Sequence, residues 1–340
     1  GTARPPGVRA IDPGVPRVGG PVSVGVDQVM RGRLRAKVFE PVRIGAVTLD
    51  QPVMTASGTA GHAAELAPYM NLGSLGAVVV KSLYHSPWPG NPAPRVHPLP
   101  AGMINAVGLQ GPGIEAWIAH DLPALEATGA TVVASVWGRS VDDYARAAAM
   151  LAPVAPRLAA LEVNLSCPNL EGRGGIIAHD AEISAAVVRA CSAAGVPLWA
   201  KLSPNTDRIV EVASSVVDAG ADALTLVNTV VGMAVDIEAA RPALGNGGGG
   251  VSGRAIHAVA LRAVHDVRKE LRDVPIVGVG GISSGADAIA MLQVGANAVQ
   301  VGTATFLRPD AAMRVLNGMH RWMASHGETS WSDVTSRLQR

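Results

Sequence analysis

A thiol and two side-chain amides lie close together in one short stretch, LEVNLSCPN at residues 161–169. Its first half alternates apolar and polar residues, which is the period-2 pattern of a strand. Pro168 has no backbone N–H to donate and favours an extended residue before it, so we expect the strand to end there. Cys167 would then stand at a strand's carboxyl end, between Asn164 and Asn169. Such a thiol could act as a base or a nucleophile on a planar polar substrate; the alternative is a buried cysteine without chemistry.

Two lysines and two further asparagines follow other apolar segments. Lys81 and Lys201 end apolar runs, and burying a lysine is costly unless it meets an anion or an electron-rich ring. Asn228 and Thr229 follow a third run, and Asn105 lies in a long connection. A single lysine at a strand end is more often a surface residue. Two lysines that converge with a thiol and several amides favour a binding site.

Glycine pairs late in the chain indicate a phosphate site. GVGGISSGADA places Gly280 and Gly281 at the end of one strand, and VGTATF places Gly302 and Thr303 at the end of the next. Glycines let backbone amides approach a phosphate, and the N-terminus of a following helix adds partial positive charge. The alternative is a pair of tight strand-to-helix turns that need glycine only for their geometry.

The elements that must position these residues repeat along the chain. Strand-like runs cover 52–57, 77–82, 131–138, 160–166, 197–203, 223–228, 275–280 and 298–303. Helical patterns cover 62–71, 113–128, 140–155, 180–194, 206–219, 254–272, 284–294 and 309–326. Apolar strands that alternate with helices predict a parallel sheet covered on both faces, and eight units are the count of an α/β (β/α)8 TIM barrel. An open doubly wound sheet is the alternative, although no GxGxxG sequence follows the first strand.

Two connections, 83–112 and 229–253, are long for this architecture. Loops of such length in a compact domain are usually lids or binding loops. Both follow strands, so we expect both to be insertions at the C-terminal face, where barrel enzymes place their active sites and where the loops after strands seven and eight bind phosphate.

Composition excludes several classes of protein. Lys plus Arg (28) nearly balances Asp plus Glu (27), and a net charge of +1 gives no field for nucleic acid or an anionic membrane. Two cysteines, Cys167 and Cys191, are too few for a disulfide framework or for an iron–sulfur cluster. No apolar run reaches the roughly 20 residues of a membrane span, and no signal peptide is evident. These features predict a cytoplasmic protein that binds neither nucleic acid nor membrane.

The first 37 residues differ in composition from the remainder. They are rich in Pro, Gly and Arg and show no periodicity, which predicts a flexible N-terminal extension at 1–37 before a single barrel domain at 38–340.

The sequence excludes two kinds of catalytic site, a metal centre and a serine hydrolase triad. The nine histidines show no convincing metal-ligand spacing with Asp or Glu, and no GxSxG nucleophile elbow is present. What remains is a phosphate-anchored cofactor with a thiol, lysines and amides around it, which suits flavin redox chemistry.

At this point the chain resembles the class 1 dihydroorotate dehydrogenases, flavin-dependent barrel enzymes of pyrimidine biosynthesis, over about residues 38–325. The resemblance rests on PVMTASGTAG, KS, GNPAPRV, PAGMINAVGLQGPG, EVNLSCPN, KLSPN, VNTVVGM, GGVSG, GVGGISSGADA and VGTATF. It implies an FMN cofactor and the oxidation of (S)-dihydroorotate to orotate. Class 2 enzymes carry serine where this chain has Cys167, which places the chain in class 1.

The resemblance also implies roles for individual residues. Cys167 would be the base that removes the C5 proton while the C6 hydride passes to flavin N5, and Lys201 would face the isoalloxazine edge. Substrate-binding residues would be Lys81, Asn105, Gly108, Leu109, Asn164, Asn169, Asn228 and Thr229. Cofactor-binding residues would be Ala56, Ser57, Lys81, Ser82, Asn164, Lys201, Gly253, Gly280, Gly281, Gly302 and Thr303. We expect no metal site, because the histidines show no metal-ligand spacing.

The chain also departs from the family's pattern. Ala106 stands where we expect a serine, which would alter substrate contacts slightly. The N-terminal extension is not a class 1 feature, and it lacks the apolar helical pair with which class 2 enzymes reach membrane quinone.

A second resemblance concerns the electron acceptor and the partner subunit. VNTVVGMAVDI resembles the subclass that passes electrons to a separate subunit carrying FAD and an iron–sulfur cluster, and we also expect a homodimer. Fumarate or another soluble acceptor is the alternative. Alternative functions are a related FMN barrel reductase such as dihydrouridine synthase, whose tRNA substrate the near-neutral charge disfavours, and a non-catalytic flavin-binding subunit.

Overall fold

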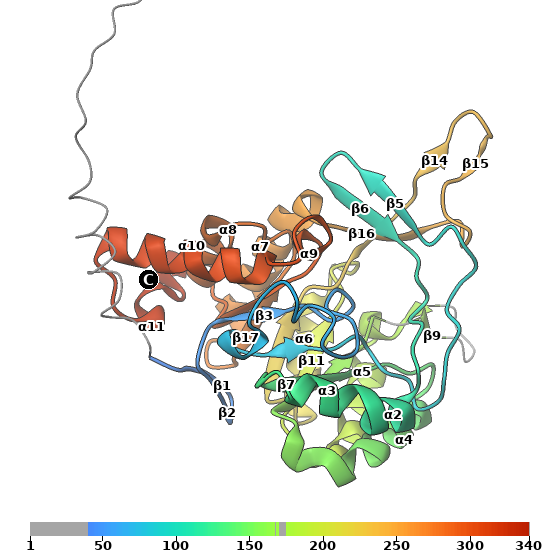
Figure 1. Cartoon of the computed structure of the whole chain (residues 1–340), viewed down its shortest axis with the longest axis horizontal. Coiled ribbons are helices and arrows are strands. Elements are labelled where there is room, and N and C mark those ends of the chain that lie inside the picture. The colour runs from blue at the N-terminus through green and yellow to red at the C-terminus, as the bar shows by residue number, and fades with distance from the viewer. Residues whose placement is uncertain (1–39, 167, 170–174, 340) are drawn as a thin grey trace, which may run out of the picture. The chain divides into compact units, whose positions relative to one another are not determined.

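The structure is a computed structural model that describes residues 40–166, 168–169 and 175–339 (Figure 1). The expected N-terminal extension at 1–37 lies outside these ranges, and so does Cys167. The limits of the extension and of the barrel domain therefore stay predictions.

Eight parallel strands form a sheet that closes on itself. In chain order they are β3 (Val53–Thr55), β4 (Val78–Val79), β7 (Val132–Val136), β8 (Ala160–Asn164), β11 (Leu198–Leu202), β12 (Ala223–Leu226), β17 (Ile276–Val279) and β18 (Ala298–Val301). Each strand pairs with the next in the chain, β18 returns to β3, and a bridge between Met54 and Ala77 joins β3 to β4. The strands lie within the eight predicted runs. The predicted (β/α)8 barrel is confirmed, and the open doubly wound sheet is wrong.

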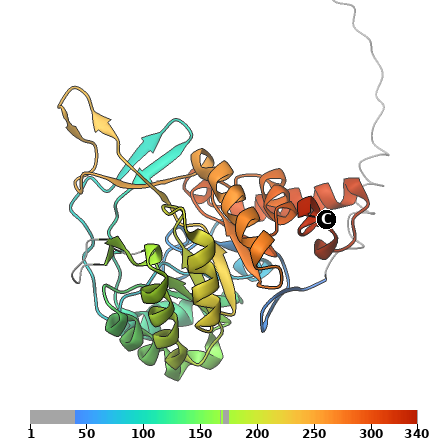
Figure 2. The ribbon, with the colours of Figure 1, turned by 180° about the vertical axis from the view of Figure 1, so that it is seen from behind.

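Helices cover the outside of the barrel, and Figure 2 shows the green-to-yellow helices α4, α5 and α6 side by side. The long ones are α4 (Val141–Leu151), α5 (Ala181–Cys191), α6 (Ile209–Asp218), α7 (His257–Glu270), α8 (Gly285–Gln293) and α10 (Ala311–His326). The short ones are α2 (Ile114–Ala116), α3 (Leu122–Glu126), α9 (Ala304–Leu307) and α11 (Trp331–Val334). A π-helical turn covers Trp117–Asp121, and 3-10 turns cover Leu72–Ser74, Ala152–Arg157, Ile177–His179, Ser192–Ala194, Arg254–Ile256 and Arg337–Gln339.

Side-chain caps fix the beginnings of several helices. Ser140, Asp180 and Ser284 each accept a hydrogen bond from the backbone N–H three residues ahead, at the starts of α4, α5 and α8. A cap of this kind satisfies an N–H that has no partner inside the helix. The helical patterns predicted to begin at residues 140 and 180 therefore begin at these two caps.

The helix predicted at 62–71 is wrong, because this segment forms turns. The Glu65 carboxylate accepts hydrogen bonds from the backbone N–H groups of His62 (3.0 Å) and Ala63 (2.8 Å), which closes a tight turn. Pro68 follows three residues later and would clash with a preceding helical turn. Local hydrogen bonding and proline therefore outweigh the apolar periodicity.

The two long connections pair with each other beyond the carboxyl ends of the barrel strands. The first connection contains β5 (Val96–Leu99) and β6 (Gly102–Asn105), and the second contains β13 (Val230–Gly232) and β16 (Gly249–Ser252). These four form one antiparallel sheet in the order β13-β16-β6-β5. In Figure 1 the hairpin of β14 (Val235–Asp236) and β15 (Arg241–Pro242) projects beyond them. Segments more than a hundred residues apart thus build one structure over the barrel.

Two small pairings complete the strands. The first is the hairpin of β1 (Val42–Ile44) and β2 (Val47–Leu49), whose alternate side chains are buried, and the second joins β9 (Pro168–Asn169) to β10 (Gly175–Ile176). None of the helices described is both long enough and apolar enough to span a lipid bilayer.

A close crossing of two helices provides a test of the packing. A methyl group on Gly285, at the start of α8, would lie 2.5 Å from the backbone nitrogen of Met319 in α10. We expect Gly285→Ala to lower the free energy of unfolding by about 1–3 kcal/mol, because the clash outweighs alanine's better helix propensity. Chemical denaturation measures the loss. The control Lys269→Ala, at an exposed position of α7, should change it by no more than about 0.5 kcal/mol. Equal stability of the Gly285→Ala variant and the parent would contradict the close packing.

Candidate active site

Strand register decides which side chains enter the barrel. Paired residues of neighbouring parallel strands point to the same side of the sheet. Lys201 pairs with Asn164, Glu162 pairs with Ser135, and Glu162 lies two residues before Asn164 in β8. All four side chains therefore share the interior face. The alternating pattern of 160–166 thus has its polar side inside the barrel.

Asn164 connects three strand ends. Its Nδ2 donates to Ser82 Oγ (3.3 Å), and its Oδ1 accepts from Asn228 Nδ2 (3.1 Å) and from the backbone N–H of Ser166 (3.2 Å). Its backbone carbonyl accepts a hydrogen bond from the Tyr144 hydroxyl (2.6 Å). These contacts fix the direction of a buried amide at the base of the segment that leads to Cys167. The structure brings Asn164, Asn228 and Ser82 together.

Three serines form a neighbouring cluster. Ser82 Oγ lies 3.0 Å from Ser57 Oγ and 2.9 Å from Ser135 Oγ, and Ser57 donates to Ser135 at 3.3 Å. Ala56 precedes Ser57 at the end of β3, where its N–H donates to the Val301 carbonyl at 2.9 Å. The sequence predicted Ser57 and Ser82 but missed Ser135. Its polar side chain inside the apolar run of β7 was a signal that could have identified it.

Lys201 has partners inside the barrel that sequence reasoning missed. Its Nζ lies 3.1 Å from Glu162 Oε1 and 3.5 Å from Gln300 Oε1, and Gln300 Nε2 donates to Glu162 Oε2 at 2.7 Å. The ammonium is therefore paired before any ligand binds.

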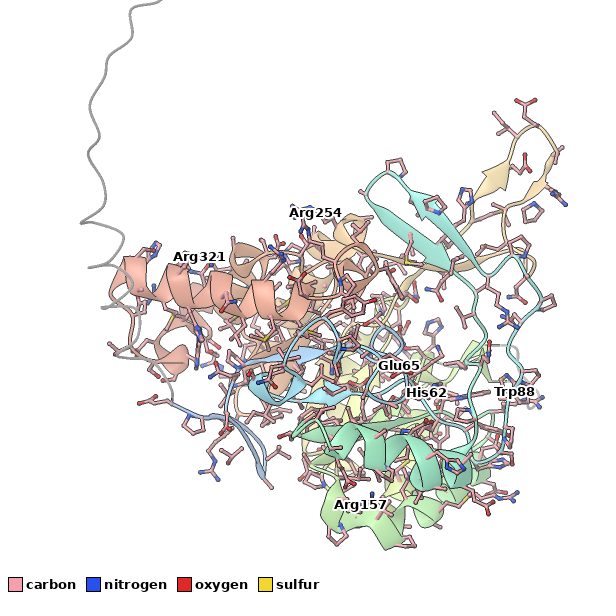
Figure 3. All side chains as sticks on the ribbon, viewed as in Figure 1. His62, Glu65, Trp88, Arg157, Arg254 and Arg321 are labelled. Carbon is pink, nitrogen blue, oxygen red and sulfur yellow. The ribbon has the colours of Figure 1, made fainter. Side chains whose placement is uncertain are left out.

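Lys81 is different, because its pKa is lowered from the ordinary value by burial and no carboxylate of the described residues offsets this. A methyl group on Gly58 would lie 3.9 Å from Lys81 Nζ. Burial and the Lys81 charge also lower the pKa of His62, which lies with Glu65 on the segment after β3 (Figure 3). A cation held this way is stabilised by an anionic ligand.

The turns after β16, β17 and β18 form a glycine cradle, Gly253, Gly280, Gly281 and Gly302. The first three have φ angles of 91°, 136° and 69°, which only glycine adopts readily. A methyl group on Gly281 would lie 2.9 Å from the Gly253 carbonyl oxygen, and Thr303 Oγ1 donates to Ser252 Oγ at 2.8 Å. Backbone amides and hydroxyls without bulky side chains are what a phosphate requires.

The other predicted residues lie in the connections around the mouth. Asn105 Nδ2 donates to the Gly250 carbonyl (3.2 Å), and the Thr229 N–H donates to Asn228 Oδ1 (2.8 Å). Gly108 and Leu109 have φ angles of 74° and 59° in the first long connection. Cys167 and the side chain of Asn169 lie outside the described residues.

Two further observations complete the geometry. Asn205, which the residue-by-residue prediction omitted, donates from Nδ2 to Ser203 Oγ (2.8 Å) and to the Thr229 carbonyl (3.0 Å). Within the ranges that the structure describes, no group of three or more His, Cys, Asp or Glu side chains could hold a metal ion.

Comparison with known proteins identifies the family. A family model described as dihydroorotate dehydrogenase matches residues 41–323. The chain belongs to the dihydroorotate dehydrogenase family. A protein of Trichlorobacter lovleyi is 46% identical over 299 residues, 88% of this chain and 98% of its own length. One of Desulforudis audaxviator is 46% identical over 305 residues, 89% and 99% of the two chains, and one of Pelobacter propionicus is 44% identical over 299 residues, 88% and 98%.

These three relatives are each named dihydroorotate dehydrogenase B (NAD(+)), catalytic subunit. The resemblance to the class 1 dihydroorotate dehydrogenases that the motifs indicated is confirmed. A dihydrouridine synthase is not favoured by these matches.

The barrel mouth of this dihydroorotate dehydrogenase fits the flavin on which the family depends. The glycine cradle can receive a phosphate, and the amides of Asn164 and Asn228 can meet planar polar rings. Lys81 and Lys201 supply positive charge. The buried carboxylate of Glu162 is paired with Lys201, and this pairing reduces its repulsion of an anionic ligand.

The buried charge of Lys81 makes two predictions, one about stability and one about ligand binding. Its lowered pKa means that the unfolded chain binds the proton more tightly, so stability should rise with pH between the folded-state pKa and the ordinary value of 10.5. We expect Lys81→Met to abolish this rise and to leave the ligand-free protein at least as stable at neutral pH. The same variant should bind orotate more weakly. Denaturation across pH and orotate titration measure both effects; a less stable variant with an unchanged pH slope would contradict the assignment.

Proposed function

We propose that this chain is the catalytic subunit that oxidises (S)-dihydroorotate to orotate in de novo pyrimidine biosynthesis, with FMN bound in the barrel mouth. The observation that carries the proposal is the buried Asn164 amide, held between Ser82 and Asn228 and leading directly into the Cys167 segment. Family membership supports the reaction, and the glycine cradle supports a cofactor with one phosphate.

The side chains of the mouth would orient the substrate. Asn105, Asn164, Asn169 and Asn228 would hold the pyrimidine ring and its carboxylate, with Gly108, Leu109 and Thr229 contributing from the two connections. Lys81 would attract the carboxylate, because binding an anion relieves the cost of its own burial. Orientation of this kind removes much of the entropic barrier to reaction.

Cys167 would take the C5 proton. A thiol has an ordinary pKa of about 8.5, and neighbouring positive charge lowers it toward the working pH of a general base. The bound FMN would supply the hydride acceptor for substrate C6. Ala56, Ser57, Ser82 and Lys201 would border the ring, and Gly253, Gly280, Gly281, Gly302 and Thr303 would hold the phosphate.

The relatives' names support a partner subunit for electron transfer. They are called catalytic subunits of an NAD(+) enzyme, which implies a second subunit. This chain has two cysteines and cannot itself hold a four-thiolate cluster, so we propose that the partner carries FAD and the iron–sulfur cluster. A homodimer of catalytic subunits in the cytoplasm completes the proposal.

Anaerobic reduction of the FMN-loaded chain by dihydroorotate tests the reaction and the base together. The parent should lose its flavin absorption on mixing. Cys167→Ala should slow this loss by about 10²–10⁴-fold near neutral pH, because the proton then has no positioned acceptor.

Cys191→Ala is the matched control. Cys191 is buried in α5, and burial raises the pKa of its thiol to about 12, so it should not contribute as a base. This variant should react like the parent. Full-rate reduction of Cys167→Ala would refute the base, and a parent that dihydroorotate never reduces would refute the substrate.

A further inference from the structure

A buried ion pair lies on the floor of the proposed flavin site. Glu162 and Gln300 are 0% exposed and Lys201 is 5% exposed, and they come from three different strands, β8, β18 and β11. Lys201 Nζ points back to Glu162 Oε1 at 3.1 Å. Because Glu162 lies two residues before Asn164, the ammonium is held on the interior side of the Asn164 layer.

Stability alone gives a weak reason for such a pair. Two charges lose their hydration when they are buried, and replacing a buried ion pair by apolar residues is often neutral or stabilising. The other buried side chain in register with Lys201, Thr225, is uncharged and its hydroxyl has no partner in the described part of the chain. Stability alone therefore does not explain why the barrel interior keeps a buried carboxylate and a buried ammonium at these positions.

We propose that Glu162 is a positioning residue that holds the Lys201 ammonium back from the proposed flavin site, and so lowers the reduction potential of the bound flavin. The inference rests on the proposed flavin-dependent function. A flavin gains negative charge when it is reduced, and a nearby ammonium favours that state. The ion pair at 3.1 Å restrains the ammonium and keeps it from moving closer to the flavin, so the potential depends on the pair and not on the lysine alone.

Gln300 assists by fixing the carboxylate. Its amide donates to Glu162 Oε2 at 2.7 Å and accepts from Lys201 at 3.5 Å, so one side chain contacts both charges. A carboxylate with both oxygens engaged cannot turn toward the mouth, where it would repel the substrate's own carboxylate.

The test is the midpoint potential of the FMN-loaded full chain, measured by anaerobic reductive titration against a reference dye. Glu162→Gln keeps the shape and removes the negative charge. The equilibrium constant for flavin reduction should rise by about tenfold, which is an increase of about 30 mV in the midpoint potential of a two-electron couple. Thr225→Val, equally buried and adjacent in register, should leave the potential unchanged.

A second variant keeps the test decisive if an unpaired Lys201 prevents folding. Glu162→Asp retains the charge but withdraws it by one methylene, so a rise smaller than that of Glu162→Gln is expected. No rise in either variant, with flavin bound and dihydroorotate still reducing the parent, would overturn the inference and leave the proposed function standing. A parent that binds no flavin would overturn the proposed function itself.

A double-variant cycle separates positioning from a direct effect of the carboxylate. Glu162→Gln should shift the potential when Lys201 is present and should shift it little in a Lys201→Met background. An equal shift in both backgrounds would show that Glu162 acts on the flavin without Lys201, and would overturn the positioning role.

Discussion

Closure of eight parallel strands is the constraint on which the site depends. Because all eight strands are parallel and β18 closes onto β3, every strand ends on the same face of the barrel. Residues as far apart as Glu162 and Gln300 then meet inside one ring, and Ser82, Asn164 and Asn228 meet at its rim. No local segment of the chain could assemble these groups.

The closed barrel also places the two lysines of the site, Lys81 and Lys201, in different surroundings. Lys201 pairs with Glu162 at 3.1 Å. Lys81 has no carboxylate partner among the described residues, and burial lowers its pKa. The two lysines that look alike in the sequence therefore differ: Lys201 is paired with a carboxylate of the protein, and Lys81 is free to pair with the anion that we propose as substrate. This division suits a mouth that receives a negatively charged substrate over a cofactor.

Sequence patterns predicted what depends on local periodicity and on turn chemistry. The eight strand runs and the helix starts near residues 140 and 180 followed from the apolar patterns, and the glycine turns followed from their place after the last two strand runs. Glu162 was missed, because alternation does not say whether the polar side of a strand faces water or a barrel interior. The pairing of β6 with β16 was missed as well, because such contacts between distant loops leave no local signal. The false helix at 62–71 arose where Pro68 and the Glu65 turn overrode periodicity.

A crystal structure of the chain grown with FMN and orotate would test the central claim most directly. The account predicts the FMN phosphate against Gly281 and Gly302, with orotate in hydrogen-bond contact with Asn164 and Asn228. It also predicts that Lys201 remains paired with Glu162 beneath the ring. Ligands bound away from the carboxyl ends of β8, β17 and β18, or orotate without contact to either asparagine, would contradict it.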